Sequence, residues 1–272
     1  MSQKVSVITI NYNNKVGLEK TIQSVINQTW LGFEYIIIDG ASTDGSKELI
    51  ERYSDKINYW VSEPDTGVYN AMNKAIKVAN GDFVIFMNSG DTFYENSILE
   101  KVNPLLTDQY DIYYGDNYKV KPSSKRKKNY PEKLSFAFFY SSCINHQSTL
   151  IRRKMFYDYF LYNEEYRIVS DWEFFIYTIC VENRPYKYLQ MTISNYDFTG
   201  ISSLDKYRHI AKQEKVAVFD KYFPMFIEDF DKVSDIKSKR IQQVLYIKNF
   251  KTPWKVFKGI INFLALFSSK KG

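Results

Sequence analysis

Cysteine is scarce in this sequence, and the motifs that usually accompany it are missing. Cys143 and Cys180 are the only cysteines among 272 residues, too few for a disulfide framework, and neither has the spacing of a metal-binding motif. The N-terminal segment lacks the apolar run of a secretory signal, and no internal repeat or low-complexity tract is present. We therefore expect a protein of a reducing compartment, located in the cytoplasm.

Glycine-rich nucleotide motifs are missing as well. No G-x-G-x-x-G sequence follows the first predicted strand, and no Walker A sequence occurs in the chain. These absences argue against a dinucleotide-dependent dehydrogenase and against a P-loop enzyme.

Acidic residues are absent from two basic segments. Residues 248–272 carry six lysines, and because the formal net charge is +6, the rest of the chain sums to zero. A nucleic-acid binder would spread its basic charge over one face, so we expect no nucleic acid partner. The second segment, residues 119–128, carries six lysines and arginines and is predicted to be a solvated loop.

Strand-like and helical patterns alternate along the first 90 residues. Predicted helices span residues 16–28, 46–53 and 68–78, between predicted strands at 4–11, 35–38, 57–61 and 83–87. This order indicates right-handed βαβ units and a mostly parallel sheet. Further along the chain we expect antiparallel or irregular pairing of strands at 110–116 and 144–151, a helix at 170–180, a short strand pair within 186–197, and helices from 203 onward that break at Pro224 and Pro253.

Polar loops follow three of the predicted strands. They begin at Asn11, at Asp39 and at Asn88, and the last of them ends with Asp91. Parallel strands bring their carboxyl ends to one edge of the sheet, so these loops are predicted to form a ligand pocket. Taken alone, Asp91 fits an ordinary polar turn as well as it fits a ligand contact.

Six segments carry a family likeness: VSVITINYN, EYIIIDGASTDGS, EPDTGVYNAMNKAI, GDFVIFMNSGD, INHQSTLIRRKMF and SDWEFF. In this order and spacing the chain resembles an inverting glycosyltransferase of family 2, of the bacterial polysaccharide type. The resemblance implies an α/β fold of the GT-A (Rossmann-like) class, a mostly parallel sheet flanked by helices. It covers residues 4–203, so residues 1–203 would form the nucleotide-sugar-binding catalytic domain and residues 204–272 a helical C-terminal extension with a basic amphipathic end.

The resemblance also implies a donor site and a metal site. Asp39 would hydrogen-bond the nucleobase, expected to be the uracil of a UDP-sugar, and Asp91 would hold Mg²⁺ or Mn²⁺. The chain departs from the acid-rich family motif, because Asn88 and Gly90 stand where many members have Asp, leaving one carboxylate. The other donor-binding residues implied are Thr9, Asn11, Tyr12, Asp65, Asn73, Lys74, Asn88, Ser89 and Gly90.

For the acceptor side, the resemblance implies that Asp171 is the general base. Glu173 is the rival carboxylate, and from the residues alone Asp171 fits an ordinary acid at a helix N-terminus. His146, Gln147 and Trp172 would lie near the acceptor or the diphosphate, although a lone histidine is often structural. Residues 200–202 resemble a family loop that closes over the donor.

The implied function is transfer of a hexosyl or N-acetylhexosaminyl group from a nucleotide-diphosphate sugar to a hydroxyl of a glycan or lipid-linked acceptor, with inversion. One alternative, a sugar-1-phosphate nucleotidyltransferase, needs a glycine-rich phosphate loop that NYNNKVG does not supply. Another is a catalytically inactive sugar-nucleotide-binding partner subunit, which only the missing acids at positions 88 and 90 favour.

The C-terminal helix is amphipathic. Lys251, Lys255 and Lys258 fall on one narrow face with Asn262, and the apolar run 259–267 is shorter than the roughly 20 residues that span a bilayer. Such a helix can lie in the interface of an anionic membrane, so we expect peripheral contact with the inner face of the cell membrane. The alternative is packing against protein. The opposite face carries Phe250, Trp254, Phe257, Ile260, Ile261, Leu264 and Phe267.

Overall fold

A computed structural model describes residues 4–200, 205–227, 229–230 and 238–267. The chain divides into two compact units, Met1–Ala217 and Val218–Gly272, which are considered separately. The domain boundary predicted after residue 203 lies outside the described residues. Ile201 and Ser202, from the loop predicted to close over the donor, also lie outside them.

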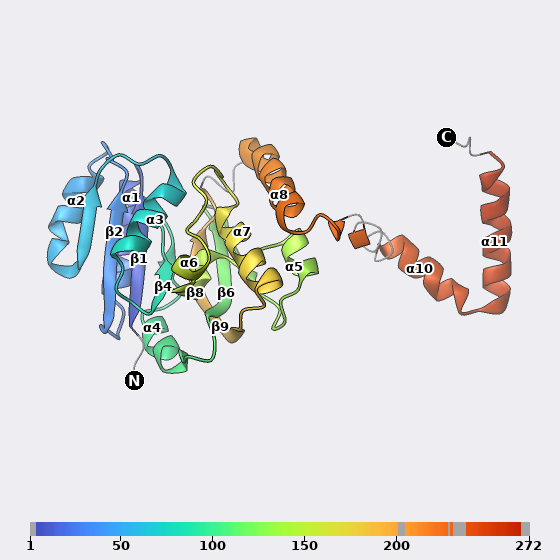
Figure 1. Cartoon of the computed structure of the whole chain (residues 1–272), viewed down its shortest axis with the longest axis horizontal. Helices are drawn as coiled ribbons and strands as arrows, with labels where there is room; N and C mark the ends of the chain where they lie inside the picture. The colour runs from blue at the N-terminus through green and yellow to red at the C-terminus, as the bar shows by residue number, and fades with distance from the viewer. Residues whose placement is uncertain (1–3, 201–204, 228, 231–237, 268–272) are drawn as a thin grey trace. The chain divides into compact units, whose positions relative to one another are not determined.

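The first half of the larger unit is a parallel sheet with helical crossovers (Figure 1). Strand order is β3-β2-β1-β4, and all three neighbouring pairs are parallel. The predicted βαβ units are therefore confirmed. Their elements are β1 (Val5–Asn11), α1 (Lys15–Ile26), β2 (Phe33–Asp39), α2 (Ser46–Arg52), a 3-10 turn (Ser54–Lys56), β3 (Tyr59–Ser62), α3 (Val68–Val78) and β4 (Phe83–Phe86).

Antiparallel pairing completes the sheet, as predicted. β8 (Thr149–Arg152) lies antiparallel between β4 and β6 (Ile112–Lys121), and β9 (Tyr186–Asp197) runs parallel to β6. β5 (Thr92–Phe93) pairs antiparallel with β9. This pairing matters for function, because it brings the end of β9 beside the residues that follow β4.

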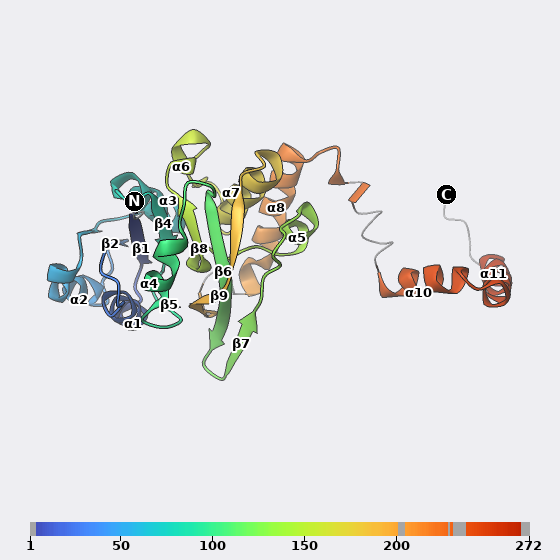
Figure 2. The same cartoon turned by 90° about the horizontal axis from the view of Figure 1, so that it is seen from below.

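Three sequence predictions for residues 119–197 are wrong in detail. Residues 119–128 are not a loop but a hairpin of β6 with β7 (Ser124–Lys128), which Figure 2 shows. The hairpin is stabilised because long lysine side chains lie over aromatic rings, with Lys125 Nζ 4.5 Å from the Tyr118 ring centroid. Residues 186–197 form one long strand with a register shift instead of a strand pair, and the strand predicted at 144–151 is shortened by a 3-10 turn at His146–Ser148.

Short helices connect the remaining strands. The helix predicted at 170–180 begins at Ser170 as expected, but it changes to π-helical geometry at Tyr177–Val181. This helix is α7 (Ser170–Ile176). The other helices between strands are α4 (Ile98–Val102), a 3-10 turn (Asn103–Leu105), α5 (Phe136–Ser141) and α6 (Met155–Asp158), and a 3-10 turn (Asp205–Tyr207) and α8 (Arg208–Tyr222) follow β9.

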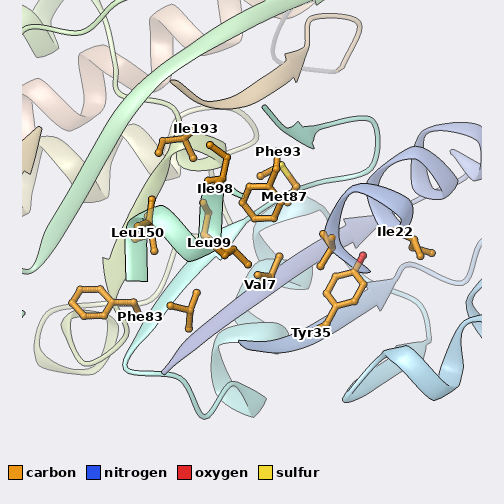
Figure 3. Close-up of a cluster of buried hydrophobic side chains, with 14 of the residues drawn as sticks. Val7, Ile22, Tyr35, Phe83, Met87, Phe93, Ile98, Leu99, Leu150 and Ile193 are labelled. Carbon is orange, nitrogen blue, oxygen red and sulfur yellow. The ribbon is translucent and has the colours of Figure 1, made fainter. Parts of the chain in front are cut away.

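Both faces of the sheet are buried. On one face, α1 and α4 cover alternate strand residues, and Figure 3 shows Ile22 of α1 and Ile98 and Leu99 of α4 among them. On the other face α3 and α7 pack over an aromatic cluster that includes Phe86 and Tyr162, whose ring centroids lie 5.8 Å apart. This cluster forms the floor beneath the site described next.

The smaller unit contains α10 (Lys239–Lys248) and α11 (Lys251–Ala265). The break between them falls at residues 249–250, and Pro253 lies inside the first turn of α11, where its missing N–H costs no helical hydrogen bond. Among the described residues, no helix has both the length and the apolar character needed to cross a membrane.

Candidate active site

Hydrogen bonds join the carboxyl ends of the parallel strands. Asn11, which pairs with Asp39 in the β1–β2 register, donates from Nδ2 to Asp39 Oδ1 at 2.7 Å. Ser89 Oγ donates to Asn11 Oδ1 at 2.7 Å. The loops after β1, β2 and β4 therefore form one braced edge, as the sequence predicted.

Asp39 is the centre of this brace. Its side chain is fully buried, and it accepts hydrogen bonds from Asn11, from the Ser42 N–H and hydroxyl, and from the Ser62 hydroxyl. Asp39 does not line the cavity, and its oxygens are occupied by these loops. Thr9 is also buried away from the cavity, because its hydroxyl donates to the Met87 carbonyl at 2.8 Å. Both residues therefore hold the strand ends together and do not line the cavity, and their predicted contact with the donor stays a prediction.

A cavity of about 910 Å³ opens along this edge. Its wall combines the strand ends with residues preceding and within α7, with the end of β9, and with α8. Gly90 is not among the lining residues, although both of its neighbours are. The predicted site residues that do line the cavity are Asn11, Tyr12, Asp65, Asn88, Ser89, Asp91, His146, Gln147, Asp171 and Trp172, and Gly200 joins them.

Asp91 occupies a buried position at the cavity wall. Only 4% of its surface is exposed, and its Oδ1 accepts the Asp197 N–H at 2.8 Å. The pKa of the Asp91 carboxyl is raised from 3.8 to about 7. Burial is the main cause and the Asp197 charge also raises this pKa, while the hydrogen bond from the Asp197 N–H and the nearby His146 lower it. An acid in this setting is poised to lose its proton when a cation binds beside it.

Asp171 lies at the start of α7 and is held by three donors. His146 Nδ1 lies 2.8 Å from its Oδ2, while the Tyr69 hydroxyl at 3.1 Å and the Trp172 N–H at 2.9 Å donate to its Oδ1. His146 Nε2 lies 3.3 Å from Asn88 Nδ2. With Asn88 donating to Nε2, Nδ1 carries the proton and donates to Asp171. These contacts fix the carboxylate yet leave it facing the cavity.

The rival carboxylate, Glu173, does not reach the cavity. It is 1% exposed and lies two residues further along α7, on the helix side that faces the protein interior. The geometry therefore separates the two acids of α7 into one that faces the cavity and one that is buried.

Gln147 and Trp172 line the cavity in different ways. Gln147 is 1% exposed, and neither Oε1 nor Nε2 of its side chain has a hydrogen-bond partner among the described residues. A buried amide without partners is costly, which favours a ligand that pairs with it. The Trp172 indole N–H instead donates to the Phe139 carbonyl at 2.9 Å, so this residue presents its ring.

Two residues predicted to bind the donor have structural partners instead. Asn73 pairs with the N–H and carbonyl of Tyr162 and also donates to Glu164. Lys74 donates to the Pro64 carbonyl at 2.9 Å and pairs with Glu63 at 2.7 Å. Neither residue lines the cavity. Both hold loops that form the wall, and their predicted contact with the donor stays a prediction.

Several cavity residues were missed by the sequence analysis. Lys119 from β6, Arg167 before α7 and Lys215 from α8 all line the cavity, and none forms an ion pair among the described residues. Burial lowers the pKa of Lys119 and of Lys215. Tyr69 and Asp197 were missed too, because no local pattern shows which residues a distant strand or helix will approach.

The residues at Asp91 fit a hard divalent cation. The described residues contain no cluster of three His, Cys, Asp or Glu side chains that could hold a metal. Asp91 is buried at the cavity wall, and the nearby Asn88 Oδ1 is buried without a hydrogen-bond partner. Carboxylate and amide oxygens are the ligands that Mg²⁺ and Mn²⁺ prefer, and Mg²⁺ is usually held by one or two carboxylates plus substrate phosphates.

Known proteins resemble this chain in sequence. The family model described as "Glycosyl transferase family 2" matches residues 6–168. A "PGL/p-HBAD biosynthesis glycosyltransferase" from Mycobacterium bovis is 27% identical over 207 residues, covering 73% of this chain and 78% of that protein.

Solved structures resemble it in fold. TarS 1–349 from S. aureus, in complex with UDP-GlcNAc, gives a TM-score of 0.59 at 21% identity and covers 71% of this chain and 58% of that chain. The mannosyltransferase PcManGT from Pyrobaculum calidifontis, in complex with GDP-Man and Mn²⁺, gives 0.60 at 16% identity and covers 81% and 64%. This chain thus spans less than two thirds of either solved chain.

Proposed function

The chain belongs to glycosyl transferase family 2, has the GT-A fold and is a glycosyltransferase, and we propose that it transfers a monosaccharide from a nucleoside-diphosphate sugar to an acceptor hydroxyl with inversion. One observation carries the proposal: Asp171 and Asp91 line the same cavity, and the contact of His146 with Asn88 connects Asp171 to the loop that bears Asp91. The two acids can therefore act on one bound substrate pair.

Asp171 is the general base of this proposal. As the acceptor oxygen attacks the anomeric carbon, its proton passes to the Asp171 carboxylate, and the bond from that carbon to the diphosphate breaks with its electron pair on the leaving group. Attack opposite the leaving group inverts the anomeric centre. His146 donates to Asp171 Oδ2 and so holds the carboxylate in one orientation.

The donor's diphosphate is proposed to lie between Asp91 and the cavity cations. Asp91 and Asn88 would hold Mg²⁺ or Mn²⁺, which when bound neutralises charge on the departing diphosphate. PcManGT, a fold neighbour, was solved with GDP-Man and Mn²⁺. Lys119, Arg167 and Lys215 lack a carboxylate partner among the described residues, which favours an anionic ligand beside them.

The nucleoside is proposed to bind where Asp65 and Tyr12 meet over Gly40. A Cβ at Gly40 would lie 2.5 Å from Asp65 Oδ2 and 3.1 Å from Tyr12 Cδ2, so a side chain there would displace Asp65 from its present position. Tyr12 is 67% exposed and offers a ring for base stacking. TarS was solved with UDP-GlcNAc, and we propose a UDP-sugar as donor for this chain. The acceptor proposed is a hydroxyl of a glycan or a lipid-linked glycan.

The test is a panel of UDP- and GDP-sugars, each measured for thermal stabilisation with and without Mn²⁺, because a ligand of the native state raises its stability. The nucleotide sugar that raises the melting temperature of the protein is then incubated with it, and the released UDP or GDP is measured. NMR of the glycoside formed with an accepted hydroxyl should show the opposite anomeric configuration to the donor. A retained configuration would exclude direct displacement, and donor binding without any turnover would favour the inactive partner subunit.

We also propose that α11 contacts an anionic membrane surface. The side chains of Val256, Ile260, Phe263 and Leu264 are each between 53% and 60% exposed. Such exposure is costly in water but suits the headgroup boundary of a bilayer, and each lysine near an anionic surface contributes about 1 kcal/mol. The charge supports this partner, since residues 248–272 hold six lysines and no acid.

Vesicle flotation tests this contact. Full-length protein should float with phosphatidylglycerol-containing vesicles at low salt and less at high salt. A form ending at Asn249 should not float. A full-length variant with Lys251, Lys255 and Lys258 replaced by Gln should float more weakly. If both the full-length and the shortened protein stay in the soluble fraction at low salt, the membrane proposal is wrong.

A further inference from the structure

The end of β9 brings a second carboxylate beside Asp91. In the β5–β9 pairing Thr92 lies opposite Asn195, and the Asp197 N–H donates to Asp91 Oδ1 at 2.8 Å. Asp91 and Asp197 both line the cavity. The two residues are 106 positions apart in sequence, so this neighbourhood is created by strand pairing alone.

Gly90 and Asp197 are sterically complementary. A Cβ added to Gly90 would lie 2.6 Å from Asp197 Oδ2, and Gly90 has φ +105°, where a side chain is strained. Any side chain at position 90 would compete with the Asp197 carboxylate for the same space.

The orientation of Asp197 is fixed through one oxygen. Its Oδ1 accepts the Thr199 N–H at 3.0 Å and the Thr199 hydroxyl at 2.7 Å. Its Oδ2 accepts no hydrogen bond from the described residues and is the oxygen that lies over Gly90. Two carboxylates this close repel each other unless a proton or a cation lies between them.

We propose that Asp197 is the second carboxylate ligand of the divalent cation held by Asp91. It supplies from β9 the acid that the loop after β4 lacks at positions 88 and 90. Asp91, Asp197 and the unpartnered Asn88 Oδ1 give an all-oxygen ligand set, and the diphosphate of the donor would complete it. This inference rests on the proposed function, because it needs the metal at Asp91.

The alternative is that Asp197 only caps the turn at Thr199. Asp44 provides a matched control, because its Oδ1 accepts the Ser46 N–H at 3.1 Å and the Ser46 hydroxyl at 2.6 Å in the same manner, and it does not line the cavity. Replacing either Asp by Asn keeps an acceptor for the turn and removes the charge. A capping role predicts the same result for both variants.

The experiment measures Mn²⁺ binding without turnover. Free Mn²⁺ is followed by electron paramagnetic resonance while full-length protein is titrated into MnCl₂ plus UDP, and again into MnCl₂ alone. Asp91→Asn should abolish binding, Asp197→Asn should weaken it at least about tenfold, and Asp44→Asn should leave it unchanged. Melting in EDTA checks that each variant is folded, and Asp197→Ser, which keeps a hydroxyl acceptor for Thr199, replaces Asp197→Asn if that variant does not fold.

The outcomes distinguish a failure of the Asp197 proposal from a failure of the proposed glycosyltransferase function. If Asp91→Asn loses Mn²⁺ and Asp197→Asn binds it like the wild type, Asp197 is not a ligand, and the metal at Asp91 stands. If the wild type itself binds no Mn²⁺ with UDP, both the metal site and the role of Asp197 are refuted. The role of Asp171 is tested independently, by whether a glycoside product forms and with which anomeric configuration.

Discussion

Replacing Asp91 with Asn should stabilise the metal-free protein at neutral pH while removing its metal site. Burial raises the pKa of the folded-state carboxyl from 3.8 to about 7. Between these values the folded protein binds more protons than the unfolded chain, so the stability of the wild type falls as pH rises from about 4 to about 7. Asparagine has no proton to lose, and this loss of stability should disappear.

The size of the effect follows from the same pKa. A rise from 3.8 to about 7 is about three pH units, and one unit corresponds to about 1.4 kcal/mol, so the ionised Asp91 costs the fold ~4 kcal/mol. The asparagine Oδ1 can still accept the Asp197 N–H that Asp91 accepts at 2.8 Å. The variant should therefore exceed the wild type by up to about 4 kcal/mol above pH 7, and the gap should narrow by about 1.4 kcal/mol per pH unit toward pH 4.

Urea unfolding in EDTA at pH 5, 6, 7 and 8 measures this gap, with Asp44→Asn as a control that should show no such pH dependence. Adding Mn²⁺ and UDP should then narrow the gap at pH 8, because only the wild type gains stability from the ligand. A gap between Asp91→Asn and wild type that is the same at pH 5 and pH 8 would refute the reasoning, since it would mean that Asp91 does not titrate in this range.

Three further substitutions, one of them with a control variant, test the site. Asp171→Asn should lower kcat by about a hundredfold or more, the scale of a lost general base, and leave the donor affinity unchanged. The control Glu173→Gln should retain turnover. Near-normal turnover of Asp171→Asn would show that Asp171 is not the general base. Asn73→Ala should lower the free energy of unfolding in urea by about 2–3 kcal/mol, because the Tyr162 N–H and carbonyl lose their partner. A loss of donor affinity in calorimetric titration of the same variant would support the predicted contact of Asn73 with the donor. Gly90→Ala should cost about 1–3 kcal/mol, because it adds strain at φ +105° and a contact with Asp197, and a melting temperature equal to that of the wild type would contradict this.

Local patterns were enough to predict the framework of the catalytic unit. β1, β2 and β4 and the helices between them follow periodicities that lie within a few residues, so the sequence alone indicates them and the edge where their loops meet. The resemblance to a glycosyltransferase family then implied that Asp91, Asp171 and His146 are site residues, and the structure brings all three to one cavity. The predicted roles of these residues remain predictions until the substitutions above are measured.

Tertiary structure decided the side-chain partners, because these depend on segments far apart in the chain. Asp39 accepts hydrogen bonds from the hydroxyls of Ser42 and Ser62, and Asn73 accepts one from the Tyr162 N–H. The periodicity of the sequence does not indicate these partners. The hairpin at 119–128 is stabilised because its lysine side chains lie over the rings of Tyr118, in β6, and Phe198, which follows β9. Asp197 lies beside Asp91, 106 residues away in sequence, only because β9 pairs with β5. The loop after β4 by itself contains one acid, whereas the folded cavity wall has two.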